Sequence, residues 1–127
     1  QGKHTGGKAP WGYKVVGPRS NPAKGVKGNR RLEPDWEERA LMLEIVRLRE
    51  LERIPCWETI AVRMRQMQRD ARRAGLDNPA LFRREWSSES CQRAHAAFWT
   101  VLVEKEGTSW IADPTIKNLA DVRLAKR

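Results

Sequence analysis

Glycine is unevenly distributed along this chain of 127 residues, and the distribution limits where helices can form. Residues 1–31 contain seven of the nine glycines and three of the seven prolines. In a helix interior, glycine costs about 1 kcal/mol and proline about 3 kcal/mol relative to alanine. We therefore predict two parts, a glycine-rich arm over residues 1–31 without a stable helix and a helical domain over residues 32–127.

The arm contains two short stretches that suit β-strands. Residues 11–16, Trp-Gly-Tyr-Lys-Val-Val, combine aromatic and β-branched side chains. Residues 17–22 have the glycine and prolines of a turn, and residues 30–32 can return as a partner strand. We predict a small β-ribbon with a basic loop, in which Trp11 and Tyr13 anchor the ribbon to a core rather than stack on bases.

Positive charge is concentrated in the same arm. Residues 1–31 carry eight cations and no acid, so they hold +8 of the formal net charge of +9. Residues 32–127 carry seventeen cations and all sixteen acids, and are nearly neutral. Such asymmetry favours a polyanionic partner, with nucleic acid ahead of an anionic membrane, and a solubilising tail is the alternative.

The first predicted helix begins at Asp35, a favourable N-cap residue, with Glu38 at the spacing of a capping box. Pro55 disfavours continuation and places the end of this helix near residues 52–54. Apolar residues repeat at helical spacing, and charged residues lie off that stripe. The predicted stripe is Leu41, Ile45, Leu48 and Leu51, and the residues predicted off it are Arg39, Arg47, Arg49 and Glu50.

Further helices are predicted over residues 56–74, with Gly75 as the stop signal, and after Trp86, with Ser87 or Ser88 as the cap. Asn78 is predicted to cap a short helical piece with Pro79 in its first turn, and a last helix is predicted over residues 115–125. The predicted apolar positions are Ile60, Ala61, Met64, Met67 and Ala71 in the second long helix, and Cys91, Ala94, Phe98 and Leu102 in the third. The expected fold is mainly α, with a small N-terminal β-ribbon and a helix-turn-helix-like helical domain.

Little in the sequence suggests catalysis, a metal or a membrane span. Cys56 and Cys91 form no CxxC pair, so we expect no metal and no cofactor, while a bridge between these two cysteines stays open. There is no nucleophile elbow, phosphate loop or carboxylate pair, and we expect His95 to be packed or exposed rather than catalytic. The longest apolar stretch, residues 96–103, is far shorter than the ~20 residues of a spanning helix, and no signal peptide is visible, so a cytoplasmic location is expected.

The two long helices on either side of residues 75–86 suggest how the domain meets DNA. In a helix-turn-helix reader, one helix braces the backbone and the next places its N-terminal residues in the major groove. Base edges are read through hydrogen bonds, and glutamine pairs well with adenine as arginine does with guanine. The predicted base-reading residues are Ser88, Glu89, Gln92 and Arg93. A solvated helix face is the alternative, and the connection is longer than the tight turn of the minimal motif.

The arm offers contacts of a second kind, because glycine allows close approach and cations neutralise phosphates or enter the minor groove. The residues predicted to contact the DNA backbone or the minor groove are Lys3, Lys8, Lys14, Arg19, Lys24, Lys27, Arg30 and Arg31. The expected partner is therefore double-stranded DNA rather than a membrane.

Several blocks of this sequence resemble the recombinase domain of the large serine recombinases, or serine integrases. The opening block is Gly6-Gly7, Pro10 and Trp11-Gly12-Tyr13. Leu32-Glu-Pro-Asp35, Ile60-Ala61 and Trp86 follow in the order that the family shows. The resemblance covers roughly residues 5 to 105. It implies a DNA-binding domain of a site-specific recombinase, which is oligomeric on DNA and encoded by a mobile genetic element of a bacterium or phage.

The sequence also departs from the family pattern. Residues 53–56 replace the usual Gly and Ser before the Ile-Ala helix, residues 68–84 form a longer segment than usual, and no cysteine-rich zinc-ribbon segment follows. The catalytic domain with its nucleophilic serine is missing. The resemblance therefore implies a chain that binds DNA without cutting it, either a fragment or a protein without its enzyme half. The alternative is a stand-alone DNA- or RNA-binding regulator with no recombinase parent.

Overall fold

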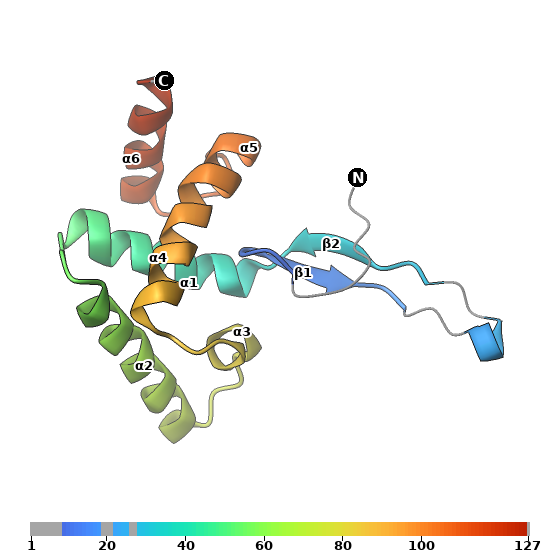
Figure 1. Ribbon diagram of the computed structural model, residues 1–127. Coiled ribbons are helices and arrows are strands. Elements are labelled where there is room, and N and C mark those ends of the chain that lie inside the picture. The colour runs from blue at the N-terminus through green and yellow to red at the C-terminus, as the bar shows by residue number, and fades with distance from the viewer. Residues whose placement is uncertain (1–8, 19–21, 26–27, 127) are drawn as a thin grey trace.

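A computed structural model describes residues 9–18, 22–25 and 28–126, and it is mainly helical with a small antiparallel ribbon near the N-terminus (Figure 1). This confirms the predicted mainly α fold with a β-ribbon. The strands are β1 (Tyr13–Val16) and β2 (Arg31–Pro34), and the helices are α1 (Trp36–Val46), α2 (Trp57–Ala74), α3 (Pro79–Arg83), α4 (Ser88–Ala97), α5 (Glu104–Glu106) and α6 (Pro114–Ala125). A 3-10 turn covers Pro22–Lys24, and π-helical turns extend α1 over Arg47–Leu51 and join α4 to α5 over Phe98–Val103.

The ribbon pairs β1 with β2, with Tyr13 opposite Pro34 and Val16 opposite Arg31. It leads directly into α1, so β2 crosses the predicted boundary between residues 31 and 32. The turn Pro22–Lys24 lies at the far end of the ribbon, away from the helices (Figure 1). The predicted contacts Lys3, Lys8, Arg19 and Lys27, and the Gly6-Gly7 pair, lie outside the described residues.

The predicted N-cap residues of α1, α3 and α4 are confirmed. The Asp35 carboxylate accepts from the Glu38 N–H at the start of α1, and the Asn78 side chain accepts from the Leu81 N–H at the start of α3. Ser87 is the N-cap of α4 and forms a reciprocal capping box with Ser90. Such caps satisfy backbone N–H groups that have no partner inside the helix.

The core lies between α1, α2 and α4, with α4 crossing α1 and packing on α2 (Figure 1). Fully buried residues come from each helix: Met42 and Ile45 from α1, Ile60 and Met64 from α2, and Cys91 and Ala94 from α4, continued by Phe98 and Leu102.

Two residues of the predicted first helix are placed differently in the structure. Leu51, predicted in the buried stripe, is 37% exposed. The π-helical turn over Arg47–Leu51 explains this, because its i→i+5 pattern rotates the chain less per residue and breaks the α-helical stripe. Arg39, predicted off the stripe, is only 1% exposed, because polar and aromatic partners enclose it.

Both cysteines are free, with Cys56 exposed and Cys91 buried, so the bridge that the sequence left open is not formed. Among the described residues, no group of histidine, cysteine and acidic side chains is arranged to hold a metal ion. In the same part of the chain, no helix combines the length and apolarity that crossing a membrane requires.

Candidate nucleic-acid interface

The N-terminal half of α4 brings the four predicted base-reading residues onto one side of a helix. Glu89, Gln92 and Arg93 are exposed, while Ser88 is half-buried. Cys91 and Ala94 fix this orientation, because both are fully buried on the opposite side. Arg93 forms an ion pair with Glu89, one turn away on the same helix. The face therefore offers a carboxylate, an amide and a guanidinium to solvent.

Hydrogen bonds between α2 and the start of α4 hold this helix in place. Glu58 accepts from the Ser88 hydroxyl at 2.8 Å and from Arg65 Nη2 at 2.6 Å. Arg65 Nη1 in turn donates to the Trp86 carbonyl at 2.7 Å. The hydrogen bond from Arg65, followed by that from Ser88, lowers the pKa of Glu58 and keeps it charged. Ser88 thus braces α4 against α2, and its base-reading role stays a prediction.

The exposed surface of α2 carries cations that sequence reasoning did not assign to the site. Arg63, Arg69, Arg72 and Arg73 are exposed. Arg63 lies 3.4 Å from Glu52, and Arg69 donates to the Gln66 side chain at 2.7 Å. These arginines were visible in the sequence, but it is the packing of α2 against α4 that places the two helices next to each other.

Four of the predicted backbone-contacting cations lie among the described residues. Lys14, Lys24 and Arg31 are exposed, and Arg30 is half-buried. Arg31 pairs with Glu33 at 3.0 Å, two residues further along β2. The Nε atom of Arg30 is buried and has no hydrogen-bond partner among the described residues. The ribbon therefore presents cations along its length.

Charged residues also join the ribbon to the helices, and we call this group the joint: Gly12, Asp35, Glu38, Arg39, Arg83, Arg84 and Glu106. The buried Glu38 carboxylate accepts from the Gly12 N–H and from Arg84 Nε, each at 2.7 Å. Arg83 donates to Asp35 at 2.6 Å. Glu38 had been predicted to complete a capping box, but its carboxylate is used by the ribbon and by Arg84 instead. Sequence reasoning missed this role because the partners lie far apart in the chain.

Arg39 forms the second half of the joint. Its Nε donates to the Gly12 carbonyl at 2.9 Å, and its two Nη atoms bind Glu106 at 2.8 and 2.9 Å. The guanidinium lies about 5 Å from the ring centroids of Tyr13, Trp36 and Trp110.

Charge within the joint is balanced. Burial raises the pKa of Tyr13, as does its hydrogen bond to Glu106. Burial opposes ionisation of Glu106, but the hydrogen bond from Arg39, followed by that from Tyr13, outweighs it and lowers the pKa of this carboxyl. Three guanidinium groups thus face the three carboxylates of Asp35, Glu38 and Glu106, which makes the joint a structural unit.

Comparison with known proteins found no match: no protein-family model, no curated protein and no solved structure is similar to this chain at a significant level. The serine recombinase expectation therefore depends on the pattern of residues alone. The structure does relate two of the blocks that carry this pattern. Trp11-Gly12-Tyr13 and Pro34-Asp35 meet at the joint, where the Asp35 N–H donates to the Gly12 carbonyl at 2.9 Å.

Proposed function

We propose that this chain is the DNA-binding module of a site-specific serine recombinase and that it binds duplex DNA at a recombination site. In this proposal α4 enters the major groove, and the ribbon and the rest of the arm follow phosphates or a minor groove. The observation that carries it is the exposed face of α4, where Glu89, Gln92 and Arg93 stand on a helix braced by α2. A DNA-bound recombinase is also the basis for proposing a cytoplasmic, DNA-associated location.

The chemistry of that face suits base reading. Gln92 has a donor and an acceptor for adenine, and Arg93 has paired donors for guanine. Glu89 holds Arg93 through an ion pair, and such a pair at the helix surface is weak enough to exchange for a base. Because buried Cys91 and Ala94 anchor the opposite side of α4, the face can approach DNA without disturbing the core.

The first experiment selects binding sites from random duplexes and compares variants on the selected site and on unrelated DNA. Arg93→Ala is expected to relax preference at one base pair, with a loss of about 1–3 kcal/mol on the selected site only. Lys24→Ala, at the far end of the ribbon, is the matched control and is expected to weaken all duplexes about equally. Equal losses across sequences for both variants would remove the case for base reading by α4.

Salt dependence tests the electrostatic part of the proposal. If about six cations of the arm neutralise phosphates, the logarithm of the affinity falls with the logarithm of salt concentration with a slope of roughly −5. Single-stranded RNA is the competitor in the same buffer. Preference for that RNA over duplex DNA would contradict the recombinase proposal and support an RNA-binding protein.

The recombinase parent is tested separately from DNA binding. Sequencing the reading frame upstream of the codon for Gln1 is expected to show a resolvase-type catalytic domain with a nucleophilic serine. An unrelated upstream frame, together with sequence-specific duplex binding, would instead support a stand-alone regulator.

A further inference from the structure

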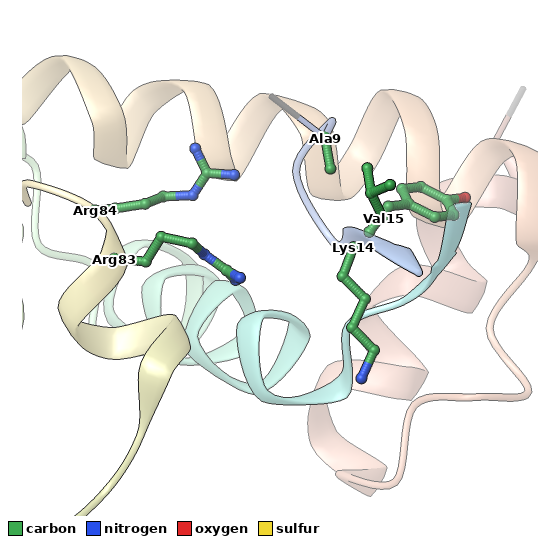
Figure 2. Close-up of a pocket in the computed structure, with 6 residues that line it drawn as sticks. Ala9, Lys14, Val15, Arg83 and Arg84 are labelled. Atoms are coloured by element: carbon green, nitrogen blue, oxygen red, sulfur yellow. The ribbon is translucent and has the colours of Figure 1, made fainter. Parts of the chain in front are cut away.

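A cavity of about 260 Å³ lies between β1 and the end of α3. It is lined by Ala9, Tyr13, Lys14, Val15, Arg83 and Arg84. Figure 2 shows Arg83 and Arg84 reaching from the α3 side toward the strand that carries Lys14. The cavity is partly open to solvent, and its volume leaves room for a phosphate group.

Among the described residues, the lining contains three cations and no carboxylate. Asp35 and Glu38, which bind the two arginines, are buried at 5% and 0% exposure, so they lie behind the guanidinium groups rather than in the opening. Arg83 uses only Nη2 for these carboxylates in the described structure, which leaves Nε and Nη1 to donate elsewhere. Three cations against two carboxylates leave a net positive charge at the cavity.

Both arginines are bound by buried carboxylates. Arg84 donates to Glu38 through Nε at 2.7 Å, and its guanidinium lies 3.6 Å from the ring centroid of Trp11. Burial opposes the charge of Arg83, but its hydrogen bond to Asp35 and the nearby charge of Glu38 raise the pKa of Arg83 above its usual value. Pre-positioned guanidinium groups bind phosphate oxygens with little loss of side-chain entropy.

Lys14 completes the cavity from the opposite side. It is exposed, and no described residue forms an ion pair with it. Glu33, which lies opposite Lys14 in the ribbon, pairs with Arg31 at 3.0 Å. Lys14 is therefore available to an anion that enters between the ribbon and α3.

The cavity also lies between the two predicted DNA contacts. Lys14 belongs to the ribbon, whereas Arg84 precedes Ser87, the N-cap of α4, by three residues. Three residues span at most about 11 Å when fully extended. The opening therefore lies next to both predicted contacts, so a DNA strand that touches Lys14 and the start of α4 can pass it.

We propose that the cavity formed by Lys14, Arg83 and Arg84 binds one phosphate of the DNA backbone and so sets the register between the ribbon and α4. The proposal rests on the proposed function for its ligand, a phosphodiester of duplex DNA, while its chemistry is that of a phosphate site.

The first test titrates inorganic phosphate into the 127-residue chain and follows the Arg83 and Arg84 Nε and Lys14 amide signals by NMR, with chloride at equal ionic strength as the reference. Saturable shifts are expected at these three residues, and Lys14→Gln is expected to weaken binding roughly tenfold. Lys24→Gln, an exposed ribbon lysine outside the cavity, is the control and is expected to leave binding unchanged. Shifts that are not saturable, or equal effects of the two substitutions, would overturn the site.

The second test replaces single phosphates of a bound duplex by methylphosphonate. One position is expected to cost the wild-type chain roughly tenfold in affinity and to cost Lys14→Gln nothing further. Lys24→Gln is expected to keep the wild-type sensitivity at that position. If duplex binding persists but no phosphate is coupled to Lys14, the DNA-phosphate assignment is wrong while the proposed function stands. If no duplex binds at all, both are wrong, whatever inorganic phosphate does.

Discussion

The joint and the exposed face of α4 are both built from acidic and basic side chains, but they differ in burial and in connectivity. Glu38 and Arg39 in the joint are 0% and 1% exposed. Both bind Gly12, so they link the start of α1 to the residue that precedes β1. Glu89 and Arg93 on α4 each have side chains that are 69% exposed, and the ion pair that they form is with one another. Buried charges must be fully paired, whereas exposed pairs contribute little.

This difference separates two tasks that a DNA-binding module must combine. The joint holds the ribbon in a fixed orientation relative to α1, so its residues are constrained by each other. The exposed residues of α4, Glu89, Gln92 and Arg93, take no part in the core, so they can be exchanged at little cost to the fold. On the proposed function, affinity from the ribbon and specificity from α4 can therefore change independently.

The largest expected effect breaks the joint. Glu38→Gln keeps the size of the side chain but removes the charge that faces Arg84 and Arg83. We expect a loss of about 3–5 kcal/mol in the free energy of unfolding, because the fully buried Glu38 side chain loses the charge that accepts from Gly12 and Arg84. Urea denaturation measured by tryptophan fluorescence checks this.

The matched control is Glu37→Gln, one residue earlier in the same first turn of α1 but exposed. It removes the same charge near the helix N-terminus and is expected to cost about 0.3–1 kcal/mol. Similar losses for the two variants would mean that Glu38 acts only through the helix dipole and not through the joint.

A second prediction concerns the close approach of the ribbon to the core at Gly12. Its φ is +84°, and an added Cβ would lie 3.0 Å from a buried Leu102 methyl carbon and 3.5 Å from Arg39 Nε. We expect Gly12→Ala to cost about 2–4 kcal/mol, the sum of left-handed backbone strain and overpacking. Gly75→Ala, at φ +68° with open space around it, isolates the backbone part at about 1–2 kcal/mol. Equal melting temperatures for the two variants would show that the joint tolerates a Cβ.

The sequence was sufficient for features that depend on near neighbours. The caps Asp35, Asn78 and Ser87 each bind an N–H three residues away, so residue type and spacing were enough to predict them. The joint was not predictable in this way, because Arg39 and Glu106 are 67 positions apart and Gly12 and Glu38 are 26 apart. Periodicity placed Arg39 off the apolar stripe, and its burial is explained by partners distant in the chain, namely Gly12, Glu106 and the aromatic rings around it.

The same limit applies to the candidate site. The exposed face of α4 followed from its helical spacing and its serine cap. The cavity between β1 and α3 did not, because Lys14 and Arg83 come together only when the ribbon packs on the helices.

A third prediction uses His95. Its side chain is 16% exposed, so its burial lies between that of the joint and that of the exposed face of α4. Desolvation lowers the pKa of His95, although the hydrogen bond to Glu50 and the charge of this residue oppose the shift. Arg49 and Arg123 also act against protonation, and Trp57 and Trp99 pack on the ring.

Because the folded chain holds the His95 proton less tightly than the unfolded chain does, stability is complete above the unfolded pKa of about 6.5 and falls as the pH drops below it. The loss is at most about 1.4 kcal/mol per pH unit, and it ends once the pH is below the folded pKa. Denaturation midpoints between pH 7 and pH 5 measure this slope. His95→Gln is expected to flatten it, and an unchanged slope in that variant would assign the pH dependence to other groups.

The smallest expected effect on stability is at the face of α4. It tests directly whether this face is independent of the joint. Arg93→Ala removes an exposed ion pair one turn apart on the same helix, which contributes about 0.3–0.5 kcal/mol. The unfolding free energy is therefore expected to stay within about 0.5 kcal/mol of the wild type, whereas Glu38→Gln lowers it several-fold more. A loss above 1 kcal/mol for Arg93→Ala would show that α4 is part of the same coupled unit as the joint. Its effect on DNA would then reflect folding rather than contact with bases. Because both residues carry a full charge, their different costs follow from burial and pairing and not from charge itself.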